Sequence, residues 1–274
     1  MTRSLSATAL KVWQRLSGIE SRRLWSELTN TKNELTNIKN ELTNSLNGRD
    51  KRLHPYVQEA LNLVSDLSLI RNRFSPSGGP EESTFTKFGS DKDTRHSYGD
   101  LYLQLLGECT NPRILEIGVG SVNGFPYAGL PAGGSLRAFR EKFPNSTIVG
   151  IDIDPDSIDI IIKDGFHGLV ADQTSDASLD KVSEVLSEFG SFDLIIDDGF
   201  HDPHANIRTL QKVFKLLSDT GTYVIEDIHE SLIDFWGSIA TNLPGNIEIF
   251  DMRALRPGVE DNILIVIKKH KLEF

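Results

Sequence analysis

Two short apolar runs in the second half of the chain each end in a pair of acids. Leu194–Ile196 and Tyr223–Ile225 are too short and too β-branched to be helices, so we predict two buried strands. In an open parallel sheet, ligands lie beyond the carboxyl ends of the strands, which is where the following polar residues would meet. Those residues are Asp197, Asp198, His201, Glu226 and Asp227.

Carboxylates that meet at one point repel one another, and the repulsion must be offset by a cation or by shared protons. A divalent metal is the simpler solution, because clustered carboxylate oxygens suit hard ions such as Mg²⁺, Ca²⁺ or Mn²⁺. A cluster that shares protons is the alternative.

A glycine turn follows an earlier predicted strand that begins at Arg113. Gly118 and Gly120 let the backbone pass close to a ligand, but the spacing to Gly124 does not match a dinucleotide fingerprint. The other interpretation is an S-adenosylmethionine (SAM) site, in which Glu116 supports the turn. Asp152, at the tip of the next strand, would accept both ribose hydroxyls, and Asp172 would lie near the adenine. A strand-end turn without a ligand is the alternative.

The bulk properties narrow the class of protein. The chain has 274 residues and a net charge of −10 without a basic block, which weighs against a nucleic-acid substrate. Cys109 is the only cysteine, so no intrachain disulfide can form, and we expect a cytoplasmic protein. We see neither a signal peptide nor a run of about 18 apolar residues that could span a membrane.

The N-terminal residues differ from the rest of the chain. Residues 27–47 repeat every seven residues, with leucines at 28, 35 and 42, so we predict a coiled coil for self-association or partner docking in residues 1–50. A solvated tail is the alternative. Residues 51–86 are predicted as a helical lead-in, with a helix over His54–Phe74, and a linker. Residues 87–274 are predicted as the catalytic domain.

The remaining sequence alternates between strand and helix patterns. This rhythm predicts an α/β fold with a doubly wound, mostly parallel, seven-stranded Rossmann-like sheet. Two final strands, Ile247–Met252 and Asn262–Lys268, form an antiparallel C-terminal hairpin in this prediction. One helix is predicted from Asp93 to Gly107.

The chain resembles class I SAM-dependent methyltransferases. Ile114–Gly120 looks like their first motif, Gly150–Asp152 looks like their second, and the final strands look like the hairpin that closes their fold. SAM is therefore the expected cofactor.

A narrower resemblance, over about residues 86–270, is to the metal-dependent sugar O-methyltransferases of macrolide biosynthesis, of the mycinamicin and macrocin type. It depends on a combination of motifs: Phe88–Lys92, His96 with Tyr98, Gly134–Arg137, Phe143–Asn145, Asp197–His201 and Val224–Asp227.

This resemblance implies roles for individual residues. Asp198, Glu226 and Asp227 would bind the metal, with Mg²⁺ expected, and His201 would be the general base. Ser135 and Tyr98 lie in matched motifs and are placed on the cofactor side. Asp197 is placed there too, where it either orients the turn or contacts a ligand amine.

The sequence also departs from the family. Phe200 stands where the family usually has serine, and the N-terminal repeat has no counterpart in it. We therefore expect a sugar hydroxyl as acceptor, on a surface polysaccharide or a natural-product glycoside. The alternatives are another small diol acceptor and a non-catalytic or redox relative of the same fold. We expect a homo-oligomer or a protein partner through the coiled coil, association with a polysaccharide-assembly complex, and no nucleic acid.

Overall fold

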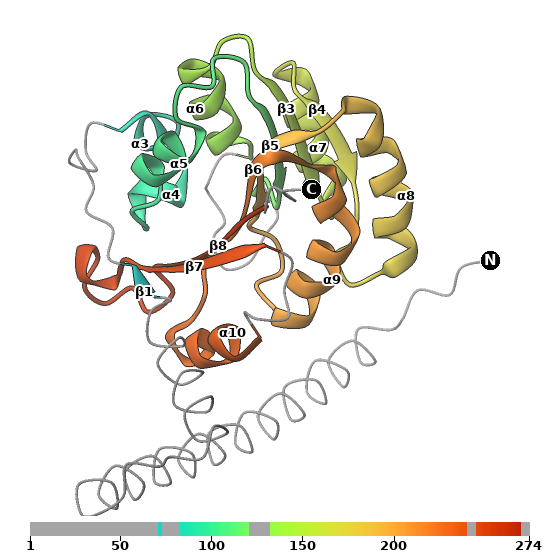
Figure 1. Cartoon of the computed structure of the whole chain (residues 1–274). Helices are drawn as coiled ribbons and strands as arrows, with labels where there is room; N and C mark the ends of the chain where they lie inside the picture. Colours follow the sequence, from blue (N-terminus) through green and yellow to red (C-terminus); the bar gives the residue numbers. More distant parts are fainter. Residues whose placement is uncertain (1–70, 73–82, 121–131, 240–244, 270–274) are drawn as a thin grey trace, which may run out of the picture. The chain divides into compact units, whose positions relative to one another are not determined.

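The computed structural model describes residues 71–72, 83–120, 132–239 and 245–269 (Figure 1). The chain divides into two compact units, and all described residues belong to the second, Ile70–Phe274. The predicted coiled coil lies outside the described residues, as does most of the predicted lead-in helix. That helix prediction is wrong at its end, because Arg71–Asn72 forms the short strand β1.

A single sheet organises the described part of the chain (Figure 1). Its order is β1-β7-β8-β6-β5-β2-β3-β4, and β8 runs antiparallel to both of its neighbours. The predicted seven-stranded sheet with an antiparallel C-terminal hairpin is confirmed, and the two-residue strand β1 is added at its edge. The other strands are β2 (Arg113–Ile117), β3 (Thr147–Asp152), β4 (His167–Val170), β5 (Phe192–Asp197), β6 (Leu217–Ile225), β7 (Asn246–Asp251) and β8 (Ile263–Lys268).

Helices cover both faces of the sheet because successive strand residues point to opposite faces. On β2, Leu115 packs in one apolar core with α8, α9 and α10, and Ile114 packs in another with α5, α6 and α7. The helices are α3 (Thr84–Lys87), α4 (Asp91–Thr94), α5 (Gly99–Leu106), α6 (Gly134–Lys142), α7 (Pro155–Lys163), α8 (Asp176–Leu186), α9 (Pro203–Val213) and α10 (Ile233–Ile239). Short 3-10 turns span Ser187–Phe189, Phe214–Leu216, Glu230–Leu232 and Arg253–Leu255.

The helix predicted from Asp93 to Gly107 is in fact two helices. The Ser90 side chain caps α4, and the Asp93 carboxylate accepts a hydrogen bond from the Gly99 backbone N–H, 3.0 Å away, where α5 begins. Polar side chains that bond to nearby backbone groups compete with a continuous helix. The break places His96 and Tyr98 between the two helices.

The sheet register brings the site-bearing strand ends together. Asp197 at the end of β5 is paired with Ile117 of β2 on one side and with Ile225 of β6 on the other. The chain runs outward from β2 to β4 and then returns to β5 on the other side of β2. This change of direction is the topological switch point at which open α/β sheets bind ligands.

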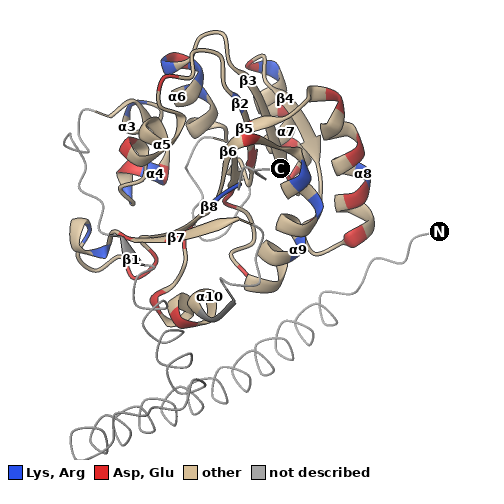
Figure 2. Cartoon of the chain, viewed as in Figure 1, with Lys and Arg blue, Asp and Glu red and all other residues tan. Residues whose placement is uncertain are grey.

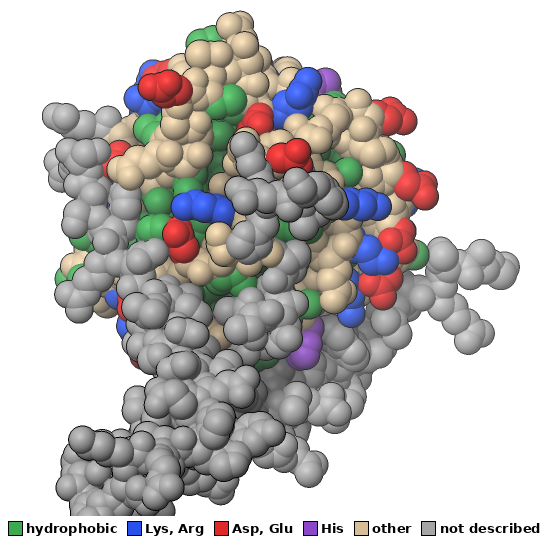
Figure 3. All heavy atoms as spheres, viewed as in Figure 1, with side chains coloured by type: hydrophobic (Ala, Val, Ile, Leu, Met, Phe, Trp, Pro, Cys, Tyr) green, Lys and Arg blue, Asp and Glu red, His purple; other side chains and the backbone are tan. Residues whose placement is uncertain are grey.

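The described surface mixes charges of both signs (Figure 2). On the face shown in Figure 3, acidic and basic side chains are interspersed, and ion pairs link α9 to α8, including Arg208–Asp176 and Lys212–Asp180. None of the described helices is both long enough and apolar enough to cross a membrane.

Candidate active site

The acids that follow β5 and β6 meet around one buried lysine. Lys92 Nζ lies 2.7 Å from Asp198 Oδ2 and 2.8 Å from Glu226 Oε1. The same nitrogen lies 3.0 Å from Oε1 of Glu116, which comes from β2. The predicted meeting of the two strand ends is therefore present, and an ammonium group that the sequence analysis did not assign lies within it.

Lys92 remains charged although its side chain is only 1% exposed. Burial lowers the pKa of an ammonium, but the charges of Asp198, Glu116 and Glu226 outweigh that effect and raise the Lys92 pKa well above its usual value. The lysine thus offsets part of the repulsion among the acids.

Burial and neighbouring acids raise the pKa of both Asp198 and Glu226, that of Asp198 well above its usual value. Burial raises the Glu226 pKa to about 7, Lys92 opposes the shift, and the charges of Asp227 and Glu116 add to it. The Tyr102 hydroxyl donates to the same Oε1 atom that Lys92 contacts. One oxygen of Glu226 is therefore committed to Lys92 and Tyr102.

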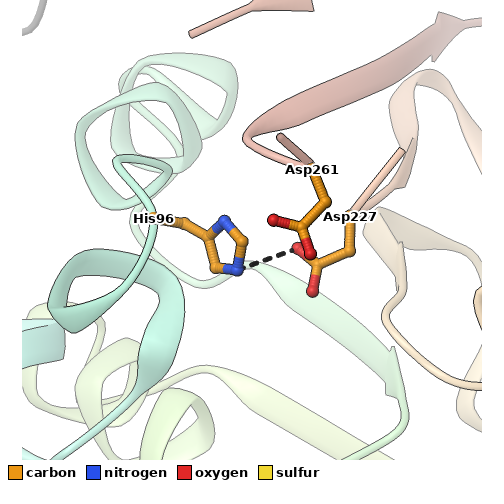
Figure 4. Close-up of side chains that lie close together, drawn as sticks. All are labelled: His96, Asp227 and Asp261. Carbon is orange, nitrogen blue, oxygen red and sulfur yellow. Dashed lines mark ion pairs between the residues drawn. The ribbon is translucent and has the colours of Figure 1, made fainter. Parts of the chain in front are cut away.

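Asp227 has the opposite protonation behaviour. Burial would raise its pKa, but the hydrogen bond and charge of His96 prevail and hold the pKa at about 2. His96 Nε2 lies 3.2 Å from Asp227 Oδ1, and the neighbouring Asp261 carboxylate points toward the same spot (Figure 4). The Tyr98 hydroxyl also donates to Asp227 Oδ1, at 3.1 Å, while its ring stacks on that of His96.

His201 lies on the more open side of the cluster. Its Nε2 atom is 3.9 Å from Asp198 Oδ1 and 3.9 Å from Asp227 Oδ2, and its side chain is 38% exposed. His201 and Asp227 are the described non-glycine residues with a left-handed backbone, at φ 52° and 54°. Such conformations cost on the order of 1–3 kcal/mol and tend to concentrate at functional sites.

The cluster has the donors and the charge for a divalent cation. Asp198, His201 and Asp227 each offer one ligand atom, and these atoms lie within 4.8 Å of one another. When ionised, the four acids Glu116, Asp198, Glu226 and Asp227 face two cations, Lys92 and His96, so four minus two leaves two negative charges. A divalent ion would balance that charge, and carboxylate oxygens are ligands that such ions prefer.

The predicted cofactor residues lie around the ends of β2 and β3. Ser135, in the first turn of α6, donates to the Glu116 carboxylate, with 2.6 and 2.7 Å to its two oxygens. Asp152 accepts backbone hydrogen bonds from Val119 and Asp154, each at 2.9 Å. These contacts fix both acids beside the turn between β2 and α6.

The glycine turn is sterically required. Gly118 has a φ of 86°, and a Cβ atom there would meet the carbonyl oxygen of Asp198 at 2.0 Å. Gly120 also has a positive φ, of 82°. Glycine at position 118 therefore allows the loops after β2 and β5 to touch.

Two other predicted cofactor residues have structural partners. Asp197 is fully buried and accepts hydrogen bonds from Gln173 Nε2 at 2.6 Å and from the Tyr223 hydroxyl at 2.9 Å. These bonds favour the turn-orienting role that the sequence analysis considered. Asp172 accepts bonds from the backbone and the hydroxyl of Thr174 in the loop after β4.

The sequence analysis assigned no chemistry to several residues that shape the site. Lys92 lies in the polar run Asp91–His96, and Tyr102 lies in α5. The resemblance included Lys92, His96 and Tyr98 in its motifs, and that was the available signal. No sequence motif pointed to Gln173. Its side chain donates a hydrogen bond to Asp197 and accepts one from the Phe200 backbone N–H at 2.8 Å, which holds the loop before His201.

Comparisons with known proteins bear on this arrangement. No protein-family model matches the sequence. The solved structure of MycE methyltransferase from the mycinamycin biosynthetic pathway, in complex with Mg, SAH and mycinamycin VI, superposes with a TM-score of 0.51 at 22% identity. It covers 72% of this chain and 56% of MycE.

The chain has a methyltransferase fold. A second MycE structure, with Mg and SAH, agrees, with a TM-score of 0.50 at 22% identity over 73% of this chain and 56% of MycE. The methyltransferase fold places the Gly118 turn and Asp152 on one side of the switch point and the acids after β5 and β6 on the other.

Two relatives are similar in sequence over part of the chain. The 8-demethyl-8-(2-methoxy-alpha-L-rhamnosyl)-tetracenomycin-C 3'-O-methyltransferase of Streptomyces olivaceus is 35% identical over 130 residues, 47% of this chain and 31% of that protein. The mycinamicin VI 2''-O-methyltransferase of Micromonospora griseorubida is 38% identical over 118 residues, 42% of this chain and 27% of that protein. The resemblance seen in the motifs is confirmed by these similarities, although the matches span about a third of the relatives' length.

Proposed function

We propose that the protein is a SAM-dependent, divalent-metal-dependent O-methyltransferase that acts on a sugar hydroxyl. The observation that carries the proposal is the convergence of the Asp198 and Asp227 carboxylates with the His201 imidazole, whose polar atoms lie within 4.8 Å of one another at the switch point of a methyltransferase fold. The names of both sequence relatives, and the Mg and SAH bound in MycE, support it.

The residues of the site divide into three roles. When bound, the divalent ion polarises the acceptor hydroxyl and SAM supplies the methyl group. Asp198, Glu226 and Asp227 hold the ion, with Mg²⁺ proposed. His201 accepts the hydroxyl proton as general base, since its Nε2 lies beside Asp198 and Asp227 and remains partly exposed to an incoming acceptor.

The cofactor side depends on the turn after β2. The Asp152 carboxylate receives the ribose diol of SAM, and Glu116 with Ser135 fixes the turn beside it. Gly118 and Gly120 let the backbone approach the ligand. Asp172 lies near the adenine of the cofactor in this proposal. Tyr98 supports the metal side through its hydrogen bond to Asp227, and Asp197 orients the turn through its bonds with Gln173 and Tyr223.

His201→Gln tests the proposed base. We expect turnover to fall by about 10²- to 10⁴-fold, because proton transfer by a positioned group contributes that much, while SAH and Mg²⁺ affinities stay within about threefold. The assay follows methylation by mass spectrometry on a panel of glycosides and catechols. A matched control is His167→Gln, since His167 lies at the start of β4, where its ring packs against Phe189.

The panel also decides between acceptor classes. Methylated glycosides support the proposal. Methylation of catechols alone would replace the sugar acceptor with another small diol, and failure to bind SAH at all would overturn the methyltransferase function.

We also propose that residues 1–50 form a coiled coil for self-association or docking, and that the enzyme works in the cytoplasm beside a polysaccharide-assembly complex. The heptad leucines at 28, 35 and 42 motivate this proposal. Deletion of residues 1–50 should lower the number of chains per particle, as measured by light scattering, or abolish partner capture in cells. An unchanged number of chains and unchanged capture would refute the role of this segment.

A further inference from the structure

A buried ammonium and a proposed metal site share the same carboxylates. Lys92 is 1% exposed and contacts Glu116, Asp198 and Glu226, which follow or belong to three different strands. Its cost of burial is met only because all three partners are acids. Of its three partners, Glu116 and Glu226 are about as buried as the lysine, and Asp198 is 12% exposed.

The two oxygens of Asp198 face different groups. Oδ2 lies 2.7 Å from Lys92 Nζ, whereas Oδ1 lies 3.9 Å from His201 Nε2. The ammonium therefore lies on one side of this carboxylate, and the ligand atoms of His201 and Asp227 lie on the other. Lys92 contacts two of the three proposed metal ligands, Asp198 and Glu226, so its charge acts directly on the carboxylates that would hold the ion.

We infer that Lys92 is a built-in counter-ion that stabilises the acid cluster without metal and, by the same charge, weakens its affinity for Mg²⁺. This inference rests on the proposed function, because it assumes a divalent ion at Asp198 and Asp227. Lys92 is a positioning residue here, since it acts on the ion through Asp198 and Glu226.

The physical reason is repulsion between like charges. An ammonium and a divalent ion that share a carboxylate repel each other strongly in a buried site, where screening is weak. Lys92 and the metal ion also compete for the same negative charge, because each of them reduces the repulsion among the acids that the other would offset. Removal of the ammonium should therefore make the metal-free fold less stable and the metal-bound state more favoured.

Loss of the Lys92 charge should also affect the cofactor side of the site, through Glu116. Glu116 joins the cofactor side, where Ser135 donates to its carboxylate, to the metal side, where Asp198 and Glu226 lie. A neutral residue at position 92 would leave Glu116 buried without this cation, so SAH affinity reports on the cofactor side while Mg²⁺ affinity reports on the other.

Lys92→Met and the more polar Lys92→Gln test the inference. We expect a lower melting temperature in EDTA and, by calorimetry with MgCl₂, an affinity at least about tenfold tighter than that of the wild type. A merely structural lysine would lower the melting temperature without tightening Mg²⁺ binding. The control is Lys87→Gln, because Lys87 is 60% exposed and pairs with Glu141 on the surface.

Each outcome of these measurements either supports or overturns the proposed role of Lys92. Tighter Mg²⁺ binding in either variant supports the inference, and unchanged or weaker binding overturns it. If neither variant folds in EDTA, folding restored by MgCl₂ supports it and a lack of rescue overturns it. Wild-type protein that binds no Mg²⁺ would overturn the proposed metal site first, which separates that failure from a failure of the role of Lys92.

Discussion

Single side chains in the cluster differ in protonation because their neighbours differ. Asp227 has His96 as a partner, and its pKa is held at about 2. Glu226 has Lys92, but it is buried near two other acids, and its pKa rises to about 7. The cluster therefore combines an acid that is ionised well below neutral pH with one that ionises near neutral pH.

From the raised pKa of Glu226 we predict that the stability of the protein depends on pH. The Glu226 pKa of about 7 in the folded protein exceeds the ordinary value of 4.5, so the folded state holds this proton more tightly. The resulting stabilisation is full below pH 4.5 and is lost as the pH rises through 7. The pKa difference corresponds to a loss on the order of 3 kcal/mol.

Urea unfolding in EDTA at several pH values between 4.5 and 8 measures this effect. Glu226→Gln should flatten the decline, because the variant has no proton to release at that position. An equally steep decline in the variant would show that another group causes it.

At the residue scale, the acids were predictable and their counter-ion was not. Asp198, Glu226 and Asp227 follow short apolar runs, and the sheet rule is enough to bring them together. The burial of Lys92 depends on partners from three strands that are distant in sequence. The Phe88–Lys92 motif marks the position, but hydrophobic periodicity around it does not predict that the lysine is buried.

At the scale of elements, the site depends on how closely the loops after β2 and β5 approach. A Cβ atom on Gly118 would meet backbone atoms of Asp198 and Gly199 within 3 Å, and backbone cannot turn aside as a flexible side chain can. The strain at this position therefore includes both an unfavourable φ and a clash.

Gly118→Ala and Gly165→Ala separate these two costs. Gly165 has a φ of 82°, similar to the 86° of Gly118, but an added Cβ would meet nothing within 4 Å. We expect Gly165→Ala to cost about 1–2 kcal/mol of unfolding free energy for the left-handed backbone alone. Gly118→Ala should cost several kcal/mol or shift the Asp198 loop, with loss of both SAH and Mg²⁺ binding. Equal costs in thermal unfolding would contradict the close approach.

Strands were predicted better than helix boundaries. The strands β3 and β5 are buried, and their continuous apolar sequence is enough to predict them, whereas the position of a helix end depends on capping. The predicted helix from Asp93 divides at the Asp93–Gly99 hydrogen bond. Helix α9 ends at Val213, because a 3-10 turn follows and β6 already begins at Leu217, where it pairs with Phe192.

At the scale of the whole described unit, the strand order separates two binding functions. β2 lies between β3, which carries Asp152, and β5, which precedes Asp198. The cofactor and the metal are thus proposed on opposite sides of one strand. The α/β class and the antiparallel closing strands were predictable from the alternation of patterns. The full strand order was not, because it depends on pairings between distant segments.

Calorimetry with SAH and with MgCl₂ on wild type, Asp198→Asn and Asp152→Asn tests the central proposal most directly. We predict that the wild type binds both ligands. Asp198→Asn should lose at least about 30-fold in Mg²⁺ affinity, about 2 kcal/mol, and keep its SAH affinity. Asp152→Asn should lose SAH affinity and keep its Mg²⁺ affinity. Asparagine keeps the size of each side chain, so a folding defect is a weak explanation for either loss. Undiminished Mg²⁺ binding in Asp198→Asn, or loss of SAH binding alone, would contradict the account.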